Sequence, residues 1–174
     1  MDLNRKTALV VGGAGGIGLG IAKALAAEGC RVAVADYSEE ALQKATADGV
    51  MKGHRCDVTD RRQVIELFDW FGEAMGPIDI LVNSAGINVG NRMMANIDPL
   101  DFDRVMAVNT TGTFNCIHAA LPVMREKRSG LIVNLVSLAG MRVMALAGMP
   151  YCVSKFATGA LGTFVNLEEA GNGI

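Results

Sequence analysis

The stretch from Lys6 to Gly29 constrains the fold of this chain more than any other. The short apolar run Lys6–Val11 predicts a buried strand. It leads directly into Gly12-Gly13-Ala14-Gly15-Gly16-Ile17-Gly18, and Leu19–Glu28 then carries apolar residues at helical spacing. In a strand–glycine loop–helix unit, backbone N–H groups and the helix N-terminus can face an anion that side chains would otherwise block. We therefore predict a nucleotide-binding loop. A flexible glycine-rich turn and a secretory signal both rank below this interpretation, and five glycines inside the apolar stretch argue against the signal peptide.

The second predicted strand, Arg31–Asp36, ends in an acid 18 residues after Gly18. A carboxylate at this place can accept both hydroxyls of an adenosine ribose and would repel a 2′-phosphate. Out of context it would be an ordinary solvated acid at a strand end. Tyr37 follows where a basic residue would be expected for NADP, and the glycine loop contains no Arg or Lys. With no cation nearby in the sequence, we predict NAD as the cofactor.

The rest of the chain alternates predicted helices and strands, without an internal repeat or a linker. Further strands are predicted at 51–56, 79–82 and 131–136, and helices at 38–47, 60–71, 100–127 and 151–170, the third helix being interrupted near 109–112. An apolar content of 51% with few aromatic residues is typical of buried parallel strands. The pattern predicts an α/β fold, a doubly wound parallel sheet of the Rossmann type, as a single domain over residues 1–174.

Charge and metal-ligand patterns argue against several other classes. A net charge of −2 and a pI near 5.7 give no support for nucleic acid or a membrane as partner. The four cysteines share no C-x-x-C spacing and no convincing export signal is present, which predicts reduced thiols in the cytoplasm. His54 and His118 lack acidic or cysteine neighbours at metal-ligand spacing. We therefore expect no metal site.

Tyr151-Cys152-Val153-Ser154-Lys155 places a tyrosine and a lysine on one face of a predicted helix, with a Cα rise of about 6 Å. An ammonium about 4 Å from a phenol favours the phenolate by roughly 4 kcal/mol at an effective dielectric near 20. Such a pair can carry out proton transfer near neutral pH. By itself the spacing is more often an accidental pair on a helix surface, so its meaning depends on the other motifs.

Together these motifs resemble those of the short-chain dehydrogenase/reductase family, and the resemblance covers the whole chain. The glycine loop is similar to T-G-x-x-x-G-x-G, with Val11 at the threonine position. Asn83-Ser84-Ala85-Gly86 resembles N-N-A-G, with Ser84 as the departure, and Asp57-Val58 matches the pair that contacts the adenine edge. Ser137 lies 14 residues before Tyr151, one more than the commonest spacing. We interpret the extra residue as a loop insertion between Ala139 and Pro150.

The resemblance implies a catalytic set and a cofactor site. Tyr151 would transfer the alcohol proton, and Lys155 would stabilise its phenolate and bind the nicotinamide ribose. Ser137 would hydrogen-bond the substrate oxygen, and Asn109 would break the long helix and seat a water that relays the proton. The catalytic residues are thus Asn109, Ser137, Tyr151 and Lys155, and the cofactor-binding residues are Gly12, Ala14, Gly15, Gly16, Ile17, Gly18, Asp36, Tyr37, Asp57, Val58, Asn83, Ala85, Gly86, Tyr151 and Lys155.

We predict an NAD-dependent oxidoreductase that acts on a small-molecule secondary alcohol or ketone. Two alternatives stay open: a non-catalytic nucleotide-binding or interaction protein of the same fold, and a 3-oxoacyl reductase using NADPH, which Asp36 disfavours. The substrate is open among steroids, sugar alcohols, acyl thioesters and small ketones. Five methionines fall in two predicted loops on the substrate side, where they could equally line a pocket, pack in the core or form a subunit contact. They are Met93, Met94, Met141, Met144 and Met149.

The resemblance also implies a homo-oligomer, a dimer or a tetramer, and the predicted helices 100–127 and 151–170 are rich in apolar residues on more than one face. The chain ends after a predicted helix, where the resemblance calls for a sixth strand. Without that strand, Leu131–Val136 would be an apolar sheet edge, which is an aggregation hazard. We therefore expect a longer native polypeptide that carries the family's last strands.

Overall fold

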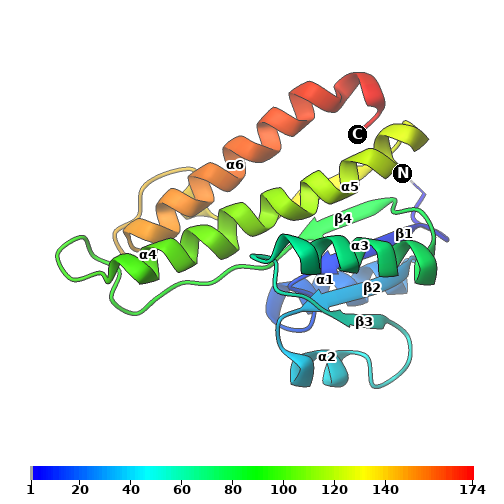
Figure 1. Cartoon of the computed structure of the whole chain (residues 1–174), viewed down its shortest axis with the longest axis horizontal. Coiled ribbons are helices and arrows are strands. Elements are labelled where there is room, and N and C mark those ends of the chain that lie inside the picture. Colours follow the sequence, from blue (N-terminus) through cyan, green and yellow to red (C-terminus); the bar gives the residue numbers. More distant parts are fainter. Residues whose placement is uncertain (1) are drawn as a thin grey trace.

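The structure, a computed structural model that describes residues 2–174, contains one parallel sheet with helices on both faces (Figure 1). The strands are β1 (Thr7–Val11), β2 (Arg31–Asp36), β3 (Lys52–Arg55), β4 (Ile80–Asn83) and β5 (Leu131–Asn134), in the order β3-β2-β1-β4-β5. The main helices are α1 (Gly16–Ala27), α2 (Glu39–Ala45), α3 (Arg61–Met75), α4 (Pro99–Met106), α5 (Thr113–Lys127) and α6 (Met149–Glu169). Every strand pair is parallel, which confirms the predicted doubly wound α/β fold.

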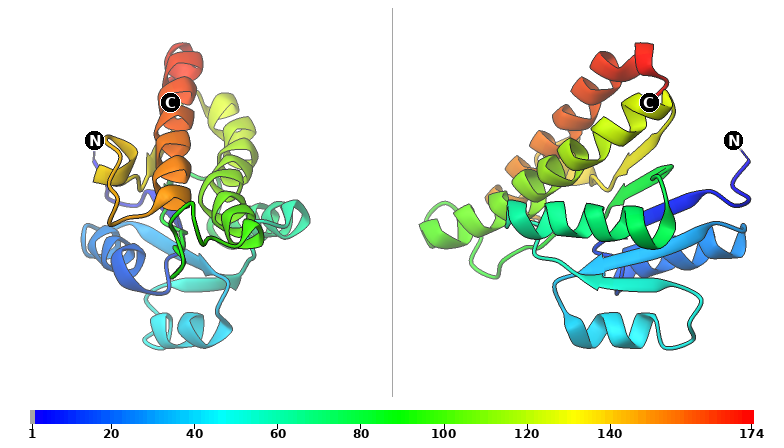
Figure 2. Two further views of the ribbon diagram at one scale, coloured as in Figure 1. Left: turned by 90° about the vertical axis from the view of Figure 1, so that its left-hand side faces the viewer. Right: turned by 45° about the vertical axis from the view of Figure 1, so that its right-hand side comes forward.

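Alternate side chains of the central strands point to different helical layers. Leu9 and Leu81 belong to a buried cluster with residues of α3 and α5, whereas Val10 and Val82 belong to a second cluster with residues of α1 and α2. The left view of Figure 2 shows α1 on one side of the sheet and α3 and α5 on the other. Because both faces are covered, β1 is buried along its whole length, and Ala8–Val11 are apolar without alternation.

Two predicted boundaries are wrong by three or four residues, and a third, the end of β5, differs by two; each difference has a local reason. Helix α1 begins at Gly16 instead of residue 19, since the end of the glycine loop already forms its first turn. Helix α3 continues to Met75, which is buried in the same cluster as the rest of its apolar face, and ends before Gly76 at φ +86°. Strand β5 ends at Asn134, because its partner β4 ends at Asn83. The other boundaries agree within two residues.

The predicted interruption of the long helix is a π-helix, Ala107–Gly112, between α4 and α5. Asn109 is fully buried there, and its backbone carbonyl accepts hydrogen bonds from Thr113 Oγ1 at 2.9 Å and Thr158 Oγ1 at 3.1 Å. Helix α6, which carries Thr158, lies alongside α4 and the π-helix (Figure 1). The widened turn therefore presents a carbonyl to a neighbouring helix, as π-bulges often do near functional sites.

Two ion pairs fasten the other end of α5. The Arg125 guanidinium binds the carboxylate of Glu169, which is only 2% exposed and also accepts a hydrogen bond from Asn172. Lys127 Nζ lies 2.6 Å from Asp79 Oδ1 and also donates to the Ile78 carbonyl. These contacts join α5 to the end of α6 and to the start of β4.

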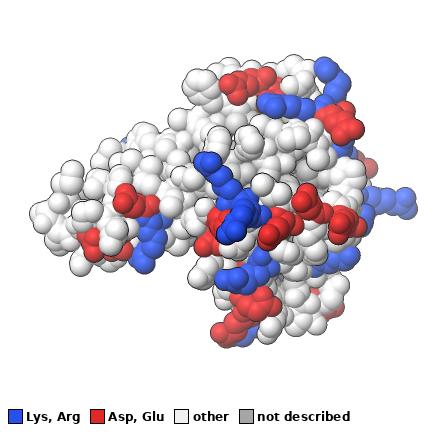
Figure 3. All heavy atoms as spheres, in the orientation of Figure 1, with Lys and Arg blue, Asp and Glu red and all other residues white. Residues whose placement is uncertain are grey.

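In the view of Figure 3, the left end of the molecule around α4 and its adjoining loops is mostly uncharged, apart from one small group of acidic and basic side chains. Met94 and Met141 are more than three-quarters exposed and Met93 is half exposed, so these three do not pack in the core of residues 2–174. Val143 and Leu146 are also largely exposed on the loop before α6. Among residues 2–174, no helix combines the length and the apolar character that crossing a membrane requires.

Candidate active site

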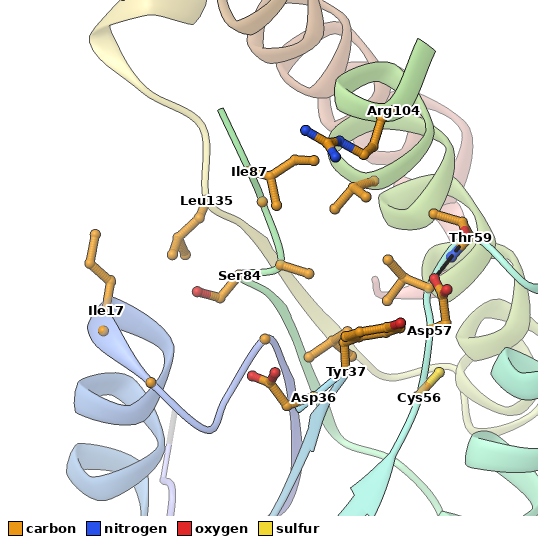
Figure 4. Close-up of a pocket in the computed structure, with 18 of the residues that line it drawn as sticks. Ile17, Asp36, Tyr37, Cys56, Asp57, Thr59, Ser84, Ile87, Arg104 and Leu135 are labelled. Atoms are coloured by element: carbon orange, nitrogen blue, oxygen red, sulfur yellow. Dashed lines mark hydrogen bonds between the residues drawn. The ribbon is translucent and has the colours of Figure 1, made fainter. Parts of the chain in front are cut away.

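A cleft of about 810 Å³ opens at the carboxyl ends of the strands (Figure 4). It lies where the chain leaves β1 for β2 on one side and where β4 flanks β1 on the other, which is the switch point at which doubly wound sheets bind ligands. Its wall combines the glycine loop, the ends of β2 and β4, the segment after β3, one face of α4 and the start of α6. The lining residues include Gly12, Gly15, Gly16, Ile17, Asp36, Tyr37, Asp57, Val58, Ala85, Gly86, Tyr151 and Lys155.

The glycine loop has three tight positions, Gly12, Gly13 and Gly18, and two open ones. A Cβ on Gly12 would collide with the backbone nitrogen of Ala85, and one on Gly18 would collide with the Gly12 carbonyl oxygen. Gly12 also has a φ of +74°, which disfavours side chains. In contrast, a Cβ built on Gly15 or Gly16 would have no atom of residues 2–174 within 4 Å apart from its chain neighbours and the backbone of α1. The N-terminus of α1 is therefore open to an anion over these two residues.

The carboxylate of Asp36 is held at the end of β2 by backbone N–H groups. Ala14 N donates to Oδ2 and Ser38 N to Oδ1, each at 3.2 Å. Tyr37 is 65% exposed, and its ring lies across the lower part of the cleft in Figure 4. Gly18 and Ala14 do not line the cleft themselves. Gly18 packs against the Gly12 carbonyl, and the backbone N–H of Ala14 orients Asp36.

The fold places a cation near Asp36 and Tyr37, although none lies near them in the sequence. Arg55, the last residue of β3, is the Cα partner of Asp36 in the sheet. Its guanidinium carbon lies 5.3 Å from the centroid of the Tyr37 ring, and its Nε donates to the Tyr37 carbonyl at 3.3 Å. Local sequence around Asp36 cannot reveal this neighbour, because the register of β2 and β3 brings it there.

Of the other residues predicted to bind the cofactor, some line the cleft and others hold the cleft-lining segments in place. Asp57 lines the cleft and its Oδ1 accepts from Thr59 N and Thr59 Oγ1, so the carboxylate also shapes its own turn. Asn83 does not line the cleft. Its Nδ2 donates to Asn134 Oδ1 at 2.8 Å, which ties the ends of β4 and β5 together, and its buried Oδ1 has no partner within residues 2–174.

Tyr151 and Lys155 lie one turn apart in α6 and both line the cleft. Lys155 Nζ is 5.7 Å from the centroid of the Tyr151 ring and donates to the Leu135 carbonyl at 2.7 Å. The side chain is buried, and this desolvation lowers the pKa of the Lys155 ammonium below its usual value of 10.5. Gly86 of the loop after β4 lies next to the ammonium: a Cβ built on it would be 3.5 Å from Nζ, an ordinary van der Waals contact.

Asn109 and Ser137 lie outside the cleft wall. Asn109 Oδ1 accepts from Ile87 N at 2.8 Å, and its Nδ2 donates to the Ile87 carbonyl and to Ser154 Oγ. The side chain thus clamps the loop after β4 to α6. Ser137 Oγ accepts from Ala139 N and caps the 3₁₀ turn Leu138–Gly140, which packs against α6. Both residues therefore contact the segments that carry the cleft residues.

Sequence reasoning did not identify several cleft residues. Arg104 of α4 points toward Ile87 in Figure 4 and pairs with Asp101 at 2.9 Å. Val108 lies one helical turn beyond Arg104, and this i, i+4 spacing ahead of Asn109 could have identified both. Ser84 lines the cleft although it was read only as a departure from a motif. The remaining additions are Val11, Cys56, Thr59, Ile87, Leu135 and Val136.

Comparison with known proteins places the cleft in context. A family model described as short chain dehydrogenase matches residues 6–174. Galactitol 2-dehydrogenase from Agrobacterium fabrum is 41% identical over 160 residues, covering 90% of this chain and 62% of that enzyme. An uncharacterized oxidoreductase from Mycobacterium bovis is 39% identical over 142 residues, covering 79% of this chain and 57% of that protein. This chain therefore spans less than two thirds of the length of either relative.

A solved structure agrees with these matches. The crystal structure of a short-chain type dehydrogenase/reductase from Mycobacterium marinum superposes with a TM-score of 0.93 at 34% sequence identity. The match covers 99% of this chain and 72% of that one.

Proposed function

The chain belongs to the short-chain dehydrogenase family, and on that premise we propose that it is an NAD-dependent oxidoreductase interconverting a secondary alcohol and a ketone. One observation carries the proposal. Tyr151 and Lys155 line the same cleft as the open glycines of the α1 N-terminus and the carboxylate of Asp36. A proton-transferring pair and a dinucleotide cradle therefore share one cavity.

The cleft residues fit a nicotinamide dinucleotide. Gly15 and Gly16 leave room for the pyrophosphate above the backbone N–H groups of α1, and Asp36 is placed to accept the adenosine ribose hydroxyls. Asp57 and Val58 would border the adenine, and Lys155 would bind the nicotinamide ribose. When bound, the nicotinamide accepts or supplies the hydride in the reaction.

Tyr151 would act as the acid and base for the substrate oxygen. In oxidation its phenolate takes the hydroxyl proton while the carbinol carbon loses its hydride, and in reduction its phenol returns the proton. The Lys155 ammonium stabilises the phenolate through its charge. Ser137 lies outside the cleft wall but directly follows Val136, which lines it, and its O–H would donate to the substrate oxygen and hold it in line with the tyrosine.

Asn109 has a further role within this proposal. Its backbone carbonyl accepts from Thr113 Oγ1, and Thr158 Oγ1 lies 3.1 Å from the same oxygen and 2.9 Å from the Ser154 carbonyl. Its side chain is engaged with Ile87 and Ser154. We therefore assign Asn109 to positioning: it holds α6 and the loop after β4 at a fixed separation, and so fixes Tyr151 and Lys155 relative to Gly86. A relay water in this region would have to hydrogen-bond to acceptors other than the Asn109 carbonyl.

The preference for NAD over NADP rests on Asp36. An extra phosphate beside a partly desolvated carboxylate would cost a few kcal/mol, and each 1.4 kcal/mol is about tenfold in affinity. Calorimetric titration with both cofactors tests this directly. Binding of NADP as tight as that of NAD would remove Asp36 from the proposal.

The exposed apolar surfaces bear on the character of the substrate site and on whether the protein forms oligomers. The apolar loops around α4 and before α6, with Met94, Met141 and Leu146 exposed, favour an apolar contact with substrate or with another subunit. Phe164 and Leu167 of α6 are also largely exposed. We propose a homo-oligomer built on such faces, and light scattering of the purified protein measures its mass.

The decisive experiment measures NADH production by the protein across a panel of secondary alcohols: a sugar alcohol, a steroid alcohol, a 3-hydroxyacyl thioester and a small aliphatic alcohol. Turnover with at least one class, absent in a protein-free control, supports the oxidoreductase. Tight NAD binding with no turnover across the panel would instead favour a non-catalytic nucleotide-binding protein. Turnover only with NADPH and an oxoacyl substrate would favour the reductase alternative.

A further inference from the structure

Arg55 is a cation beside the proposed ribose site that the NAD assignment does not use. It does not line the cleft itself, but it contacts Tyr37, which does. Its side chain is exposed, and it forms no ion pair within 4 Å among residues 2–174. It is therefore held by contacts that a stronger partner could displace.

The contacts that hold Arg55 are weak ones. The hydrogen bond from its Nε to the Tyr37 carbonyl is long, at 3.3 Å, and the guanidinium lies against an exposed ring. A cation–π contact at an exposed site is worth only about 0.5–1 kcal/mol. A phosphate, in contrast, can accept two parallel charge-assisted hydrogen bonds from the guanidinium fork. Arg55 would therefore exchange its present contacts for a phosphate that came within reach.

The sheet register determines where such a phosphate would lie. Asp36 and Arg55 are Cα partners on neighbouring parallel strands, and Tyr37 directly follows Asp36. A ribose whose hydroxyls contact Asp36 would carry a 2′-phosphate next to this carboxylate, on the side of the cleft formed by Tyr37. The carboxylate repels that phosphate, while the neighbouring guanidinium would attract it. Two opposite charges thus act on the same position.

We propose that Arg55 is a latent contact for the 2′-phosphate of an adenine nucleotide, so that the charge of Asp36 alone keeps the cleft selective for NAD. The inference rests on the proposed function, because it assumes that the adenosine ribose binds at Asp36. Neutralising Asp36 then gives a cleft that accepts the 2′-phosphate without any added cation.

The test is a double-mutant cycle with two small probes, 5′-AMP and 2′,5′-ADP, which differ only by the 2′-phosphate. Calorimetry gives the affinity ratio of the two probes for the unaltered protein, Asp36→Asn, Arg55→Gln and the double variant. Asparagine keeps an oxygen that can accept from Ala14 N or Ser38 N, so the loop retains an anchor. The matched control is Lys52→Gln, which removes another exposed cation of β3 whose Nζ instead contacts the Ala74 carbonyl.

We expect Asp36→Asn to raise the affinity for 2′,5′-ADP relative to 5′-AMP at least about tenfold. In the Arg55→Gln background, the same substitution should raise this affinity ratio less than about threefold. The difference between the two gains measures the coupling between Asp36 and Arg55. Lys52→Gln should leave the tenfold gain intact. An equal gain with and without Arg55, or no gain in either background, would overturn the inference. If the unaltered protein binds neither AMP nor NAD, the proposed function fails as well, whereas AMP binding without Arg55 dependence overturns the inference alone.

Discussion

Replacing Ser154 by alanine should loosen the clamp between the π-helix and α6. Ser154 is fully buried; its Oγ accepts from Asn109 Nδ2 at 3.0 Å and donates to the Tyr151 carbonyl at 2.8 Å. Each hydrogen bond contributes about 0.5–1.5 kcal/mol net, so the loss of both should lower the free energy of unfolding by about 1–3 kcal/mol. For a domain of this size, each kcal/mol corresponds to about 2–4 °C in Tm.

The assay is denaturant unfolding together with steady-state kinetics. The matched control is Thr163→Ala on the same helix, which removes an exposed hydroxyl that donates only to the Gly159 carbonyl four residues earlier. This control should change the free energy of unfolding by less than about 0.5 kcal/mol and leave kcat unchanged. Ser154→Ala should also lower kcat more than it raises KM for the cofactor, because Tyr151 is displaced while the glycine loop is not. Equal effects of the two substitutions on stability and kcat would refute the clamp.

Three further outcomes follow from other parts of the structure. Gly15 has an extended φ of −155°, so Gly15→Val should preserve stability, but its side chain should fill the anion site and weaken NAD binding at least about tenfold. The control Gly20→Ala, on the open side of α1, should leave NAD binding unchanged, and calorimetric titration compares the two variants. The hydrogen bond and charge of Arg125 lower the pKa of Glu169 below its usual 4.5, so the stability that Glu169 contributes is present above pH 4.5 and is lost as pH falls through the lowered pKa. In unfolding experiments, the difference in free energy of unfolding between the unaltered protein and Glu169→Gln should therefore shrink below pH 4.5. A difference that stays constant with pH would exclude the ion pair as its source. Because burial lowers the pKa of Lys155, its ammonium loses its proton below pH 10.5 as pH rises, so kcat should fall on the alkaline side below that value, and a flat kcat up to pH 10.5 would exclude a required ammonium.

The sequence was sufficient for the features that depend on local pattern. The parallel α/β sheet followed from apolar strands alternating with helices, and the π-helix at Ala107–Gly112 was expected as an interruption of one long helix. The i, i+4 spacing of Tyr151 and Lys155 correctly placed both side chains on the same face of α6. In each case the physical cause lies within a few residues of the feature.

Features that depend on register and packing between distant segments were not accessible in this way. Arg55 approaches Tyr37 only because β3 pairs with β2 in one particular register. Likewise, no local pattern indicates that Thr158 of α6 donates to the Asn109 carbonyl, 49 residues away. Arg104 was missed for a different reason, since its helical spacing to Val108 was visible but an exposed arginine on a surface helix is ordinary.

The central claim is that Tyr151 transfers the proton in a cleft that binds NAD, and one variant tests it most directly. Tyr151→Phe keeps the ring and removes only the hydroxyl. The protein and its variant are compared by NADH production with the best alcohol of the panel and by calorimetric titration with NAD. The account predicts that kcat falls by about 10²–10⁴-fold, the usual contribution of general acid–base catalysis, while NAD affinity changes by less than about twofold. Near-normal turnover by Tyr151→Phe would contradict it.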